Sequence, residues 1–324
     1  MAKVARITRI GGPEVIEWQD VDLPPPGPGE VRIRTTAAGL NYIDTYHRDG
    51  TYPTDLPAAL GMEGVGVVTA LGDGVTELAV GTRVATFGPE RGAYATERNI
   101  AARHLFVLPD DIDDETAAAS LLKGCTAEFL AERASHVAPG DWVLVHAAAG
   151  GVGSILTQWL AAKGAQVIAT VGDEAKADQA RDHGATDVIL YRAEDVAKRV
   201  RGLTGGMGVR VAYDGIGRDT WEASLDALAQ RGLLISYGNA SAPVTGVALG
   251  ILAAKGSLFV TRPTLFHYYS DPAERVAGAA SLWEMIRSGK VRVTIGQRYP
   301  LLEAAQAHTD LEARRTTGST LLIP

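Results

Sequence analysis

A short glycine-rich turn gives the strongest chemical signal in the chain. Residues 146–153 read His-Ala-Ala-Ala-Gly-Gly-Val-Gly and follow directly on the apolar run 142–145. An apolar strand, a turn of small residues and a helix start form the context that a dinucleotide-binding turn requires. Gly150 has no Cβ, so the backbone can approach a pyrophosphate, and Gly153 lets the helix pack closely on the strand. The N–H groups of the first helical turn then face the phosphates, which predicts four cofactor contacts: Ala149, Gly150, Gly151 and Val152.

The turn departs from the usual pattern at one place. Ala148 stands where the first glycine of G-x-G-x-x-G is expected. The same residues therefore also fit a strand–helix junction whose small side chains serve packing alone. The neighbouring elements have to decide between the two interpretations.

The strand after the turn indicates which dinucleotide binds. In NAD-binding proteins that strand normally ends in Asp or Glu, about 20 residues past the glycines, and the carboxylate binds the ribose 2′-OH. Here the strand over residues 166–171 ends in Val171 and Gly172. A carboxylate would repel a 2′-phosphate, and its absence leaves room for one. We therefore predict NADPH rather than NADH, with Gly172 at the adenosine ribose.

Cationic and hydroxyl donors lie close to this position in the sequence. Lys176 follows on the next helical turn, and Tyr191 and Arg192 end the third strand. Such donors can hold a phosphate, so Lys176 and Tyr191 are predicted cofactor contacts. Two alternatives stay open, because Lys176 could be a solvated surface lysine and Asp173 could face the ribose.

Regular alternation of strands and helices surrounds the turn. It predicts a parallel, doubly wound Rossmann sheet with right-handed crossovers. Strands are expected at residues 142–147, 166–171, 187–190, 209–214, 233–237 and 257–261. Helices are expected near residues 152–163, 174–183, 193–203 and 220–230.

The two ends of the chain have a different character. The first 120 residues or so predict a mostly-β unit, with β-rich segments at 31–35, 64–71 and 83–87, and the next helix runs from Asp113 to about Leu122. The tail predicts a helix, a strand, a second helix and a last strand, at residues 272–288, 291–295, 301–313 and 319–323. We expect the tail to rejoin the first unit. The predicted domains are residues 1–122 plus 264–324 and, inserted between them, residues 123–263, with a cleft between the two.

Composition excludes several classes of function. The 324 residues are 46% hydrophobic and carry a net charge of −7, which argues against a nucleic-acid backbone or an anionic membrane as the main partner. No apolar run approaches the ~20 residues of a membrane-spanning helix, and the N-terminus lacks the apolar core of a signal peptide. The one cysteine, Cys125, excludes an intrachain disulfide and a multi-cysteine metal site. A soluble cytoplasmic protein is expected.

Short segments spread along the whole chain form a specific combination. They are residues 11–15, 41–46, 50–53, 61–66, 123–127, 147–153, 214–217 and 260–263. Together they resemble the NADPH:quinone oxidoreductases, the zinc-free, zeta-crystallin-like branch of the medium-chain dehydrogenase/reductase superfamily. The resemblance implies an α/β fold in which a Rossmann domain is inserted into a GroES-like, mostly-β catalytic domain. It also implies a homodimer that pairs the edge strands near Ser257–Thr261, since a long apolar edge needs a partner.

The same comparison implies chemistry without a metal. Zinc-dependent members of the superfamily use Cys where Asn41 stands and His where Met62 stands. His47 and His104 have no thiolate beside them to complete a zinc site, and we interpret both as surface or supporting histidines. Glu63 is expected to keep a structural or hydrogen-bonding role.

A quinone accepts hydride readily, so the protein has mainly to orient it and stabilise the developing oxyanion. The resemblance places Asn41, Asp44, Tyr46 and Tyr52 at the cleft floor, where the tyrosines can stack beside a ring and donate a phenolic hydrogen bond. Alternatives stay open: Asn41 could only cap a turn, Tyr52 could belong to a turn before Pro53, and the role of Asp44 is undecided. No obligate acid–base catalyst is predicted, because the hydroquinone oxygens can take protons from water.

The remaining predicted cofactor contacts rest on the same resemblance. It places Cys125 beside the nicotinamide, where relatives carry apolar residues, so we interpret Cys125 as packing. Arg262 is either an anion contact or a surface arginine. The predicted contacts are Thr126, Phe129, Tyr237, Gly238, Asn239 and Arg314, although Arg314 too could be a surface arginine.

Three functions follow as hypotheses. The first is reduction of a quinone held in the interdomain cleft. The second is NADPH-dependent reduction of a C=C bond conjugated to a carbonyl, as in alkenal and enone reductases. The third is a non-catalytic, crystallin-like NADPH-binding protein.

Overall fold

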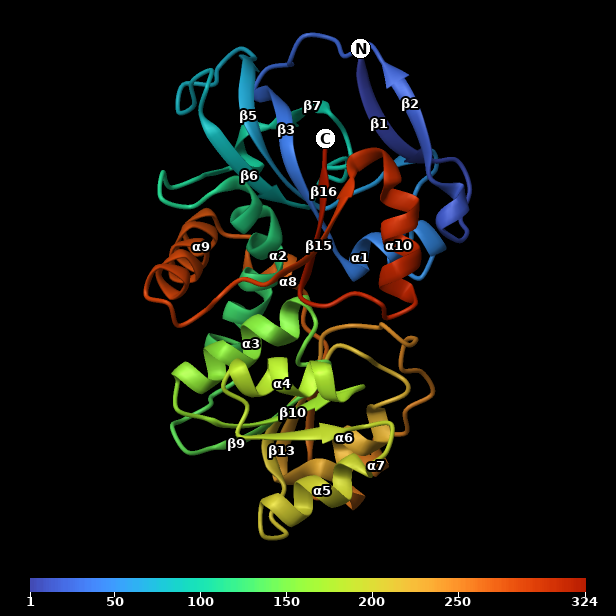
Figure 1. Ribbon diagram of the computed structural model, residues 1–324, viewed down its shortest axis with the longest axis vertical. Helices are drawn as coiled ribbons and strands as arrows, with labels where there is room; N and C mark the ends of the chain where they lie inside the picture. The colour runs from blue at the N-terminus through green and yellow to red at the C-terminus, as the bar shows by residue number, and fades with distance from the viewer. The chain divides into compact units, whose positions relative to one another are not determined.

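The computed structural model describes all 324 residues and divides into two compact units. The first unit comprises Met1–Leu122 and Val293–Pro324, and the second comprises Lys123–Arg292. In Figure 1 the second unit runs from green to orange, and the first is formed by the blue and red ends of the chain. The second unit is thus inserted into the first along the chain.

The second boundary lies later than the sequence pattern suggests. Residues 264–292, expected with the first domain, pack with the second unit. They contain α8 (Leu265–Tyr268) and α9 (Pro272–Arg287). Buried Leu282 of α9 fills the space beside Gly124, where a Cβ would lie 2.4 Å from its Cδ1. The hydroxyl of Tyr269 also donates to Glu128 at 2.7 Å. Burial of these side chains keeps the segment with the second unit.

The first unit is built on two sheets. The smaller has the order β2-β1-β4 and the larger the order β15-β16-β3-β5-β6-β8, with β7 also pairing β3. The strands are β1 (Ala2–Ile7), β2 (Glu17–Val21), β3 (Glu30–Leu40), β4 (Ala58–Ala59), β5 (Glu63–Leu71), β6 (Arg83–Phe87), β7 (Glu97–Ala101), β8 (Phe106–Val107), β15 (Ile295–Pro300) and β16 (Ser319–Ile323). The helices are α1 (Tyr42–Asp49) and α10 (Ala304–Glu312), with 3-10 turns η1 (Pro13–Val15), η2 (Ala102–His104) and η3 (Leu301–Glu303).

The tail differs from the predicted pattern at one strand. The expected strand at 291–295 is wrong, because β15 starts at Ile295 and runs to Pro300 in parallel with β16. Val291 is buried at 1% exposure, but its N–H donates to Met285 O at the end of α9. Val291 therefore packs in the turn that follows α9 and does not belong to a strand. In Figure 1 the red strand β16 lies beside β15, and β16 also pairs with β3, so the C-terminus completes the larger sheet.

The second unit is the predicted Rossmann fold. Its six parallel strands have the order β11-β10-β9-β12-β13-β14. Successive strands are added on one side of β9 up to β11 and on the other side from β12 onward, so the strand order switches between β9 and β12. They are β9 (Trp142–Val145), β10 (Gln166–Val171), β11 (Asp187–Leu190), β12 (Val209–Asp214), β13 (Leu228–Ser236) and β14 (Phe259–Thr261). The remaining helices are α2 (Asp114–Glu132), α3 (Gly151–Ala162), α4 (Glu174–Asp182), α5 (Val196–Leu203), α6 (Trp221–Ala227) and α7 (Gly250–Ala254).

Two helices end more than one residue away from the predicted C-terminal position, each for a packing reason. α2 continues to Glu132, ten residues past the predicted end at Leu122, and nearly all of its side chains from Ala117 to Ala131 are buried. α6 ends at Ala227, and the predicted helical residues 228–230 begin β13 instead. Leu228 is fully buried and pairs with Val209 of β12, so it belongs to β13 and not to α6.

Candidate active site

The glycine turn has the geometry of an anion-binding helix start. β9 ends at Val145 and α3 begins at Gly151, with Gly150 as an N-cap that makes no side-chain cap hydrogen bond. A Cβ on Gly153 would lie 2.2 Å from Ala147 O, so only glycine fits there without a shift of the backbone. The N–H groups at the start of α3 therefore have no side chain competing for them. The predicted contacts Ala149–Val152 all lie on this turn.

Hydrogen-bond donors lie close to the end of β10, and the nearest carboxylate, that of Asp173, caps the following helix. Asp173 Oδ1 accepts the backbone N–H of Lys176 at 3.0 Å and so caps α4. A Cβ on Gly172 would lie 3.2 Å from the Tyr191 hydroxyl and 3.5 Å from Arg192 Nε. The structure thus brings Gly172, Tyr191 and Arg192 together and commits Asp173 to its own helix. Lys176 stands one turn into α4, on the same edge of the sheet.

The loop after β13 packs against the loop after β12. Tyr237 N–H donates to Asp214 O at 2.8 Å, and a Cβ on Gly238 would lie 2.3 Å from Gly215 O. Arg262 Nη1 donates to Ser236 O at 2.9 Å, so this arginine supports the end of β13. The predicted residues Tyr237, Gly238 and Asn239 consequently lie at the carboxyl edge of the sheet. That edge is where open α/β sheets bind ligands.

Helix α2 carries two further predicted contacts. Thr126 is 8% and Phe129 1% exposed, and the Phe129 ring stacks on Tyr268 with centroids 4.5 Å apart. Cys125, between them and the start of the unit, is fully buried. Arg314 lies in the first unit, where it follows α10 in a left-handed conformation with φ 58°. Its N–H donates to Leu311 O at 3.0 Å.

In the first unit, Asp44 is the centre of a buried network at the start of α1. One carboxylate oxygen accepts the N–H of Asn41 at 2.9 Å and the hydroxyl of Tyr94 at 2.8 Å. The other accepts the N–H of Met62 at 2.9 Å. Burial raises the pKa of Tyr94 well above its usual value, and the Asp44 charge raises it further. Asp44 is 1% exposed and its oxygens are committed to the fold, so it holds α1 in place.

Asn41 is fixed from the opposite side by Glu63. Its Nδ2 donates to Glu63 Oε2 at 2.9 Å, and Glu63 Oε1 accepts the N–H of Leu122 at 2.7 Å. Glu63 is fully buried, and Asn41 is 6% exposed. This explains why a carboxylate follows Met62 in the chain: it orients the amide that stands at the predicted site. The hydrogen-bonding role expected of Glu63 is what the geometry shows.

Two predicted tyrosines form a pair. The Tyr46 and Tyr52 rings have centroids 5.2 Å apart at 61°, and Tyr52 N–H donates to Tyr46 O at 2.9 Å. Tyr42 extends the group at 6.3 Å from Tyr46. His47 packs edge-on against Tyr52 at 5.8 Å. The rings form one aromatic cluster at α1 and the turn that follows it.

His47 is held as a neutral ring. Its Nδ1 lies 3.0 Å from Arg91 Nη1 and 3.2 Å from Thr54 Oγ1. Burial lowers the pKa of His47 to about 4, with the Arg91 charge as the smaller cause. Because arginine can only donate, Nδ1 accepts and the proton sits on Nε2. His47 therefore supports the Tyr52 turn through Thr54 and Arg91.

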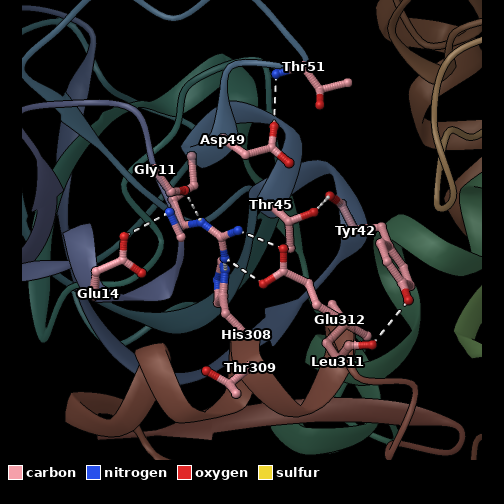
Figure 2. A network of polar contacts seen from close by, with 12 residues as sticks. Gly11, Glu14, Tyr42, Thr45, Asp49, Thr51, His308, Thr309, Leu311 and Glu312 are labelled. Atoms are coloured by element: carbon pink, nitrogen blue, oxygen red, sulfur yellow. Dashed lines mark hydrogen bonds and ion pairs between the residues drawn. The ribbon is translucent and has the colours of Figure 1, made fainter.

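A buried arginine, which no sequence motif indicates, fixes α1 to α10 (Figure 2). Arg48 is 1% exposed and makes a bidentate pair with Glu312, at 2.9 and 2.6 Å. Its Nε donates to Gly11 O, and its Nη1 lies 3.0 Å from His308 Nδ1. Tyr42 on the same helix donates to Leu311 O at 3.1 Å. Four contacts thus hold the helix that carries Tyr46, and long-range packing alone brings them together.

His308 in this cluster makes the first unit sensitive to acid. Burial, and secondly the Arg48 charge, lower the pKa of His308 from 6.5 to about 3. The folded protein keeps the ring neutral, whereas the unfolded chain protonates it. The contribution of the neutral His308 ring to the free energy of unfolding is therefore fully present above pH 6.5 and is lost as the pH falls toward 3. We expect urea unfolding to show a loss of about 1.4 kcal/mol per pH unit in this window from His308. In His308→Gln the acid loss should be smaller by about 3 kcal/mol at pH 4.5; an unchanged acid profile would contradict it.

The chain holds neither a candidate metal cluster nor a candidate membrane-spanning helix. Among the 324 residues no group of three or more His, Cys, Asp or Glu side chains could hold a metal ion. None of the helices combines the length and the apolar character that crossing a bilayer requires.

Two family models match the chain. Residues 27–139 match the family described as alcohol dehydrogenase GroES-like domain, and residues 151–271 match the one described as zinc-binding dehydrogenase. The two matches lie mainly on the first and the second unit, respectively.

Relatives are similar over the full length. A quinone oxidoreductase of Pseudomonas aeruginosa is 52% identical over 325 residues and is covered to 100%, as is this chain. A 2-haloacrylate reductase of a Burkholderia species is 44% identical, with 100% of this chain and 99% of that protein covered. The crystal structure of Escherichia coli quinone oxidoreductase complexed with NADPH superposes with a TM-score of 0.97 at 46% identity, covering 99% of this chain and 100% of that one.

Proposed function

This chain belongs to the quinone oxidoreductase family of the medium-chain dehydrogenase/reductase superfamily, and we propose that it is a zinc-independent, NADPH-dependent quinone reductase. The observation that carries the proposal is the uncapped glycine turn at the start of α3, combined with the donors gathered at Gly172. A full-length relative at 52% identity is named for the same reaction.

The residues of the second unit fit NADPH. The N–H groups at the start of α3 bind the pyrophosphate, and the missing Cβ of Gly150 allows its approach. The 2′-phosphate meets Lys176 and the Tyr191 hydroxyl, with the Arg192 guanidinium beside them. Asp173 caps α4 through its Oδ1, so this oxygen is engaged with the α4 backbone rather than with the ribose 2′-OH. When bound, NADPH supplies a hydride from the nicotinamide C4. The other proposed contacts are Thr126, Phe129, Tyr237, Gly238, Asn239 and Arg314.

In the first unit, the proposed substrate contacts are the rings of Tyr46 and Tyr52. They offer an aromatic surface for a quinone ring and phenolic donors for the oxyanion that forms on its oxygen. Asn41 and Asp44 act one step back, since their hydrogen bonds fix the start of α1. Zinc is not part of the proposal, because Asn41 and Met62 do not supply ligands that zinc prefers.

Acceptor preference tests this function. NADPH oxidation should be measured with 1,4-benzoquinone, a naphthoquinone and an enone at equal concentrations, in the presence of EDTA. We expect the quinones to react fastest and EDTA to leave the rate unchanged. A much higher rate on the enone would overturn the choice of substrate.

The second candidate is reduction of an activated C=C bond. It is favoured by one observation, the 44% identical relative named 2-haloacrylate reductase. The same assay decides, with 2-chloroacrylate added to the acceptors. Turnover of 2-chloroacrylate above that of every quinone would favour this second function.

Lys176 should determine the preference between the two nicotinamide cofactors. Removing its charge weakens only the contact with the 2′-phosphate, which NADH lacks. We expect Lys176→Ala to raise the KM for NADPH about tenfold and to leave the KM for NADH within about twofold. Lys198→Ala is the matched control, because Lys198 holds the same position after an Asp cap at the start of α5. Equal effects on both cofactors would refute the assignment.

We further propose a homodimer formed through β14. This strand ends the sheet order and pairs only with β13, and Phe259 on it is 61% exposed. An exposed apolar edge strand readily pairs with a second copy of itself. Size-exclusion chromatography with light-scattering detection should give a molar mass twice that of the single chain. A monomer mass at micromolar concentration would contradict the dimer.

A further inference from the structure

A chain of buried polar side chains runs beneath the glycine turn and plays no part in the chemistry proposed above. His146 follows β9, Thr170 lies on β10, Asp214 ends β12, and Ser224 lies on α6. All four are at most 1% exposed. His146 Nδ1 lies 3.0 Å from Thr170 Oγ1, and His146 Nε2 lies 3.0 Å from Ser224 Oγ. Ser224 Oγ donates to Asp214 Oδ2 at 2.8 Å.

Hydrogen-bonding capacity assigns every proton in this relay. The carboxylate of Asp214 can only accept, so the single proton of the Ser224 hydroxyl points to it. Ser224 Oγ must then accept from His146 Nε2–H. That leaves Nδ1 as an acceptor for the hydroxyl proton of Thr170. Burial lowers the pKa of His146, which keeps the ring in this neutral form. The relay has one arrangement and leaves none of these buried atoms without a partner.

The relay clamps the one strained residue of the turn. Ala147 has φ 51°, a left-handed conformation that costs a non-glycine residue about 1 kcal/mol or more. Thr170 contacts both residues that flank Ala147. Its side-chain hydroxyl bonds to His146, and its backbone carbonyl accepts Ala148 N–H at 3.1 Å. Ala147 O in turn accepts Gly150 N–H at 2.8 Å, and it is the atom that Gly153 leaves room for.

The other end of the relay supports the neighbouring loop. Asp214 Oδ1 accepts the N–H groups of Ile216 and Gly217 at 2.8 and 3.0 Å. Asp214 O accepts Tyr237 N–H at 2.8 Å. Asp214 therefore connects the glycine turn, through its carboxylate, with the loop that contains the proposed contacts Tyr237–Asn239, through its backbone carbonyl.

We propose that Thr170, His146, Ser224 and Asp214 are positioning residues for the cofactor: they hold Ala147 in its strained conformation and thereby set the start of α3 for the NADPH pyrophosphate. The inference rests on the proposed function, because it takes NADPH as the ligand of the turn. It assigns a share of the binding affinity to residues that are at most 1% exposed.

Thr170→Val tests the relay with almost no change of volume. It removes the proton donor to His146 Nδ1 and keeps the backbone carbonyl that holds Ala148. Thr157→Val is the matched control, because Thr157 on α3 is equally buried and its hydroxyl has no hydrogen-bond partner. Thr170→Ser restores the hydroxyl and is the rescue variant. For each folded protein, NADPH binding is measured by fluorescence titration, and KM and kcat by steady-state assay.

We expect Thr170→Val to raise the Kd for NADPH about tenfold while kcat at saturating NADPH stays within about twofold. Thr157→Val should bind as the wild type does, and Thr170→Ser should recover most of the affinity. Ser224→Ala should weaken NADPH binding to a similar extent. In the double variant Thr170→Val/Ser224→Ala, the increase in Kd should be much smaller than the product of the two single increases, because both substitutions break the same relay.

The outcomes separate the two proposals. If the wild type binds no NADPH, the proposed function fails and the relay's role fails with it. If the wild type binds NADPH and Thr170→Val binds it as tightly as Thr157→Val does, the function stands and the relay is overturned. A lower melting temperature of Thr170→Val with unchanged NADPH affinity also overturns the positioning role of the relay, because a merely structural residue would have that effect.

Discussion

Gly153→Ala should lose more than 90% of the affinity for NADPH, an effect of about tenfold or more on Kd. The new Cβ would lie 2.2 Å from Ala147 O, and 2.9 Å from Ala147 C and Ala148 Cα. These are backbone atoms of the glycine turn, so no flexible side chain can move aside. Either α3 shifts away from the turn or the turn shifts away from α3, and both displace the N–H groups that face the pyrophosphate. Overpacking of this kind also costs about 1–3 kcal/mol of stability.

Fluorescence titration with NADPH and urea unfolding measure the two effects. Gly202→Ala is the control, because Gly202 lies within α5 and a Cβ there meets nothing within 4 Å. That substitution should leave NADPH binding unchanged and stabilise the helix by about 0.5–1 kcal/mol. Wild-type affinity in Gly153→Ala would show that the turn does not hold the cofactor.

Glu312→Ala is expected to destabilise the first unit by about 3 kcal/mol. It leaves the guanidinium of Arg48, which is 1% exposed, without its countercharge. His308 cannot replace it, because the ring beside Arg48 is neutral. Arg48→Met should cost less, since the side chain of Glu312 is 35% exposed and can turn to water. The double variant should therefore be more stable than Glu312→Ala alone.

Urea unfolding of the three variants and the wild type completes a double-mutant cycle. Glu115→Ala is the matched control, because it breaks the Arg298–Glu115 pair, whose side chains are 50% and 41% exposed. An exposed pair should contribute about 1 kcal/mol at most. If Glu312→Ala cost no more than Glu115→Ala, the Arg48 cluster would not be what fixes α1 (Figure 2).

Local signals predicted the second unit better than the first. The strands at 166–171, 187–190 and 209–214 have the bounds that the sequence pattern predicted, because each is a short apolar run between turn residues. β15 was missed because its residues alternate between half-buried and exposed and carry Gly296, Gln297 and Arg298. Only its partner strand β16 gives that segment its conformation.

The site residues show a similar division. The glycine turn could be recognised from eight consecutive residues. The commitment of Asp44 could not, because its partners are the backbone of Met62 and the hydroxyl of Tyr94, distant in the sequence. The relay joins His146 to Ser224, 78 residues away, and Arg48 meets Glu312 across 264 residues. Such contacts depend on the fold as a whole, and a single sequence offers no spacing from which to predict them.

The most direct test of the central claim is a turnover experiment on EDTA-treated protein. NADPH is first titrated into the protein to establish binding, and 1,4-benzoquinone is then added while NADPH absorbance is recorded. We expect NADPH to be oxidised at a rate proportional to enzyme concentration, with one hydroquinone formed for each NADPH consumed. Tight binding of NADPH without oxidation on any quinone would contradict the account and would leave a cofactor-binding protein with no reductase activity.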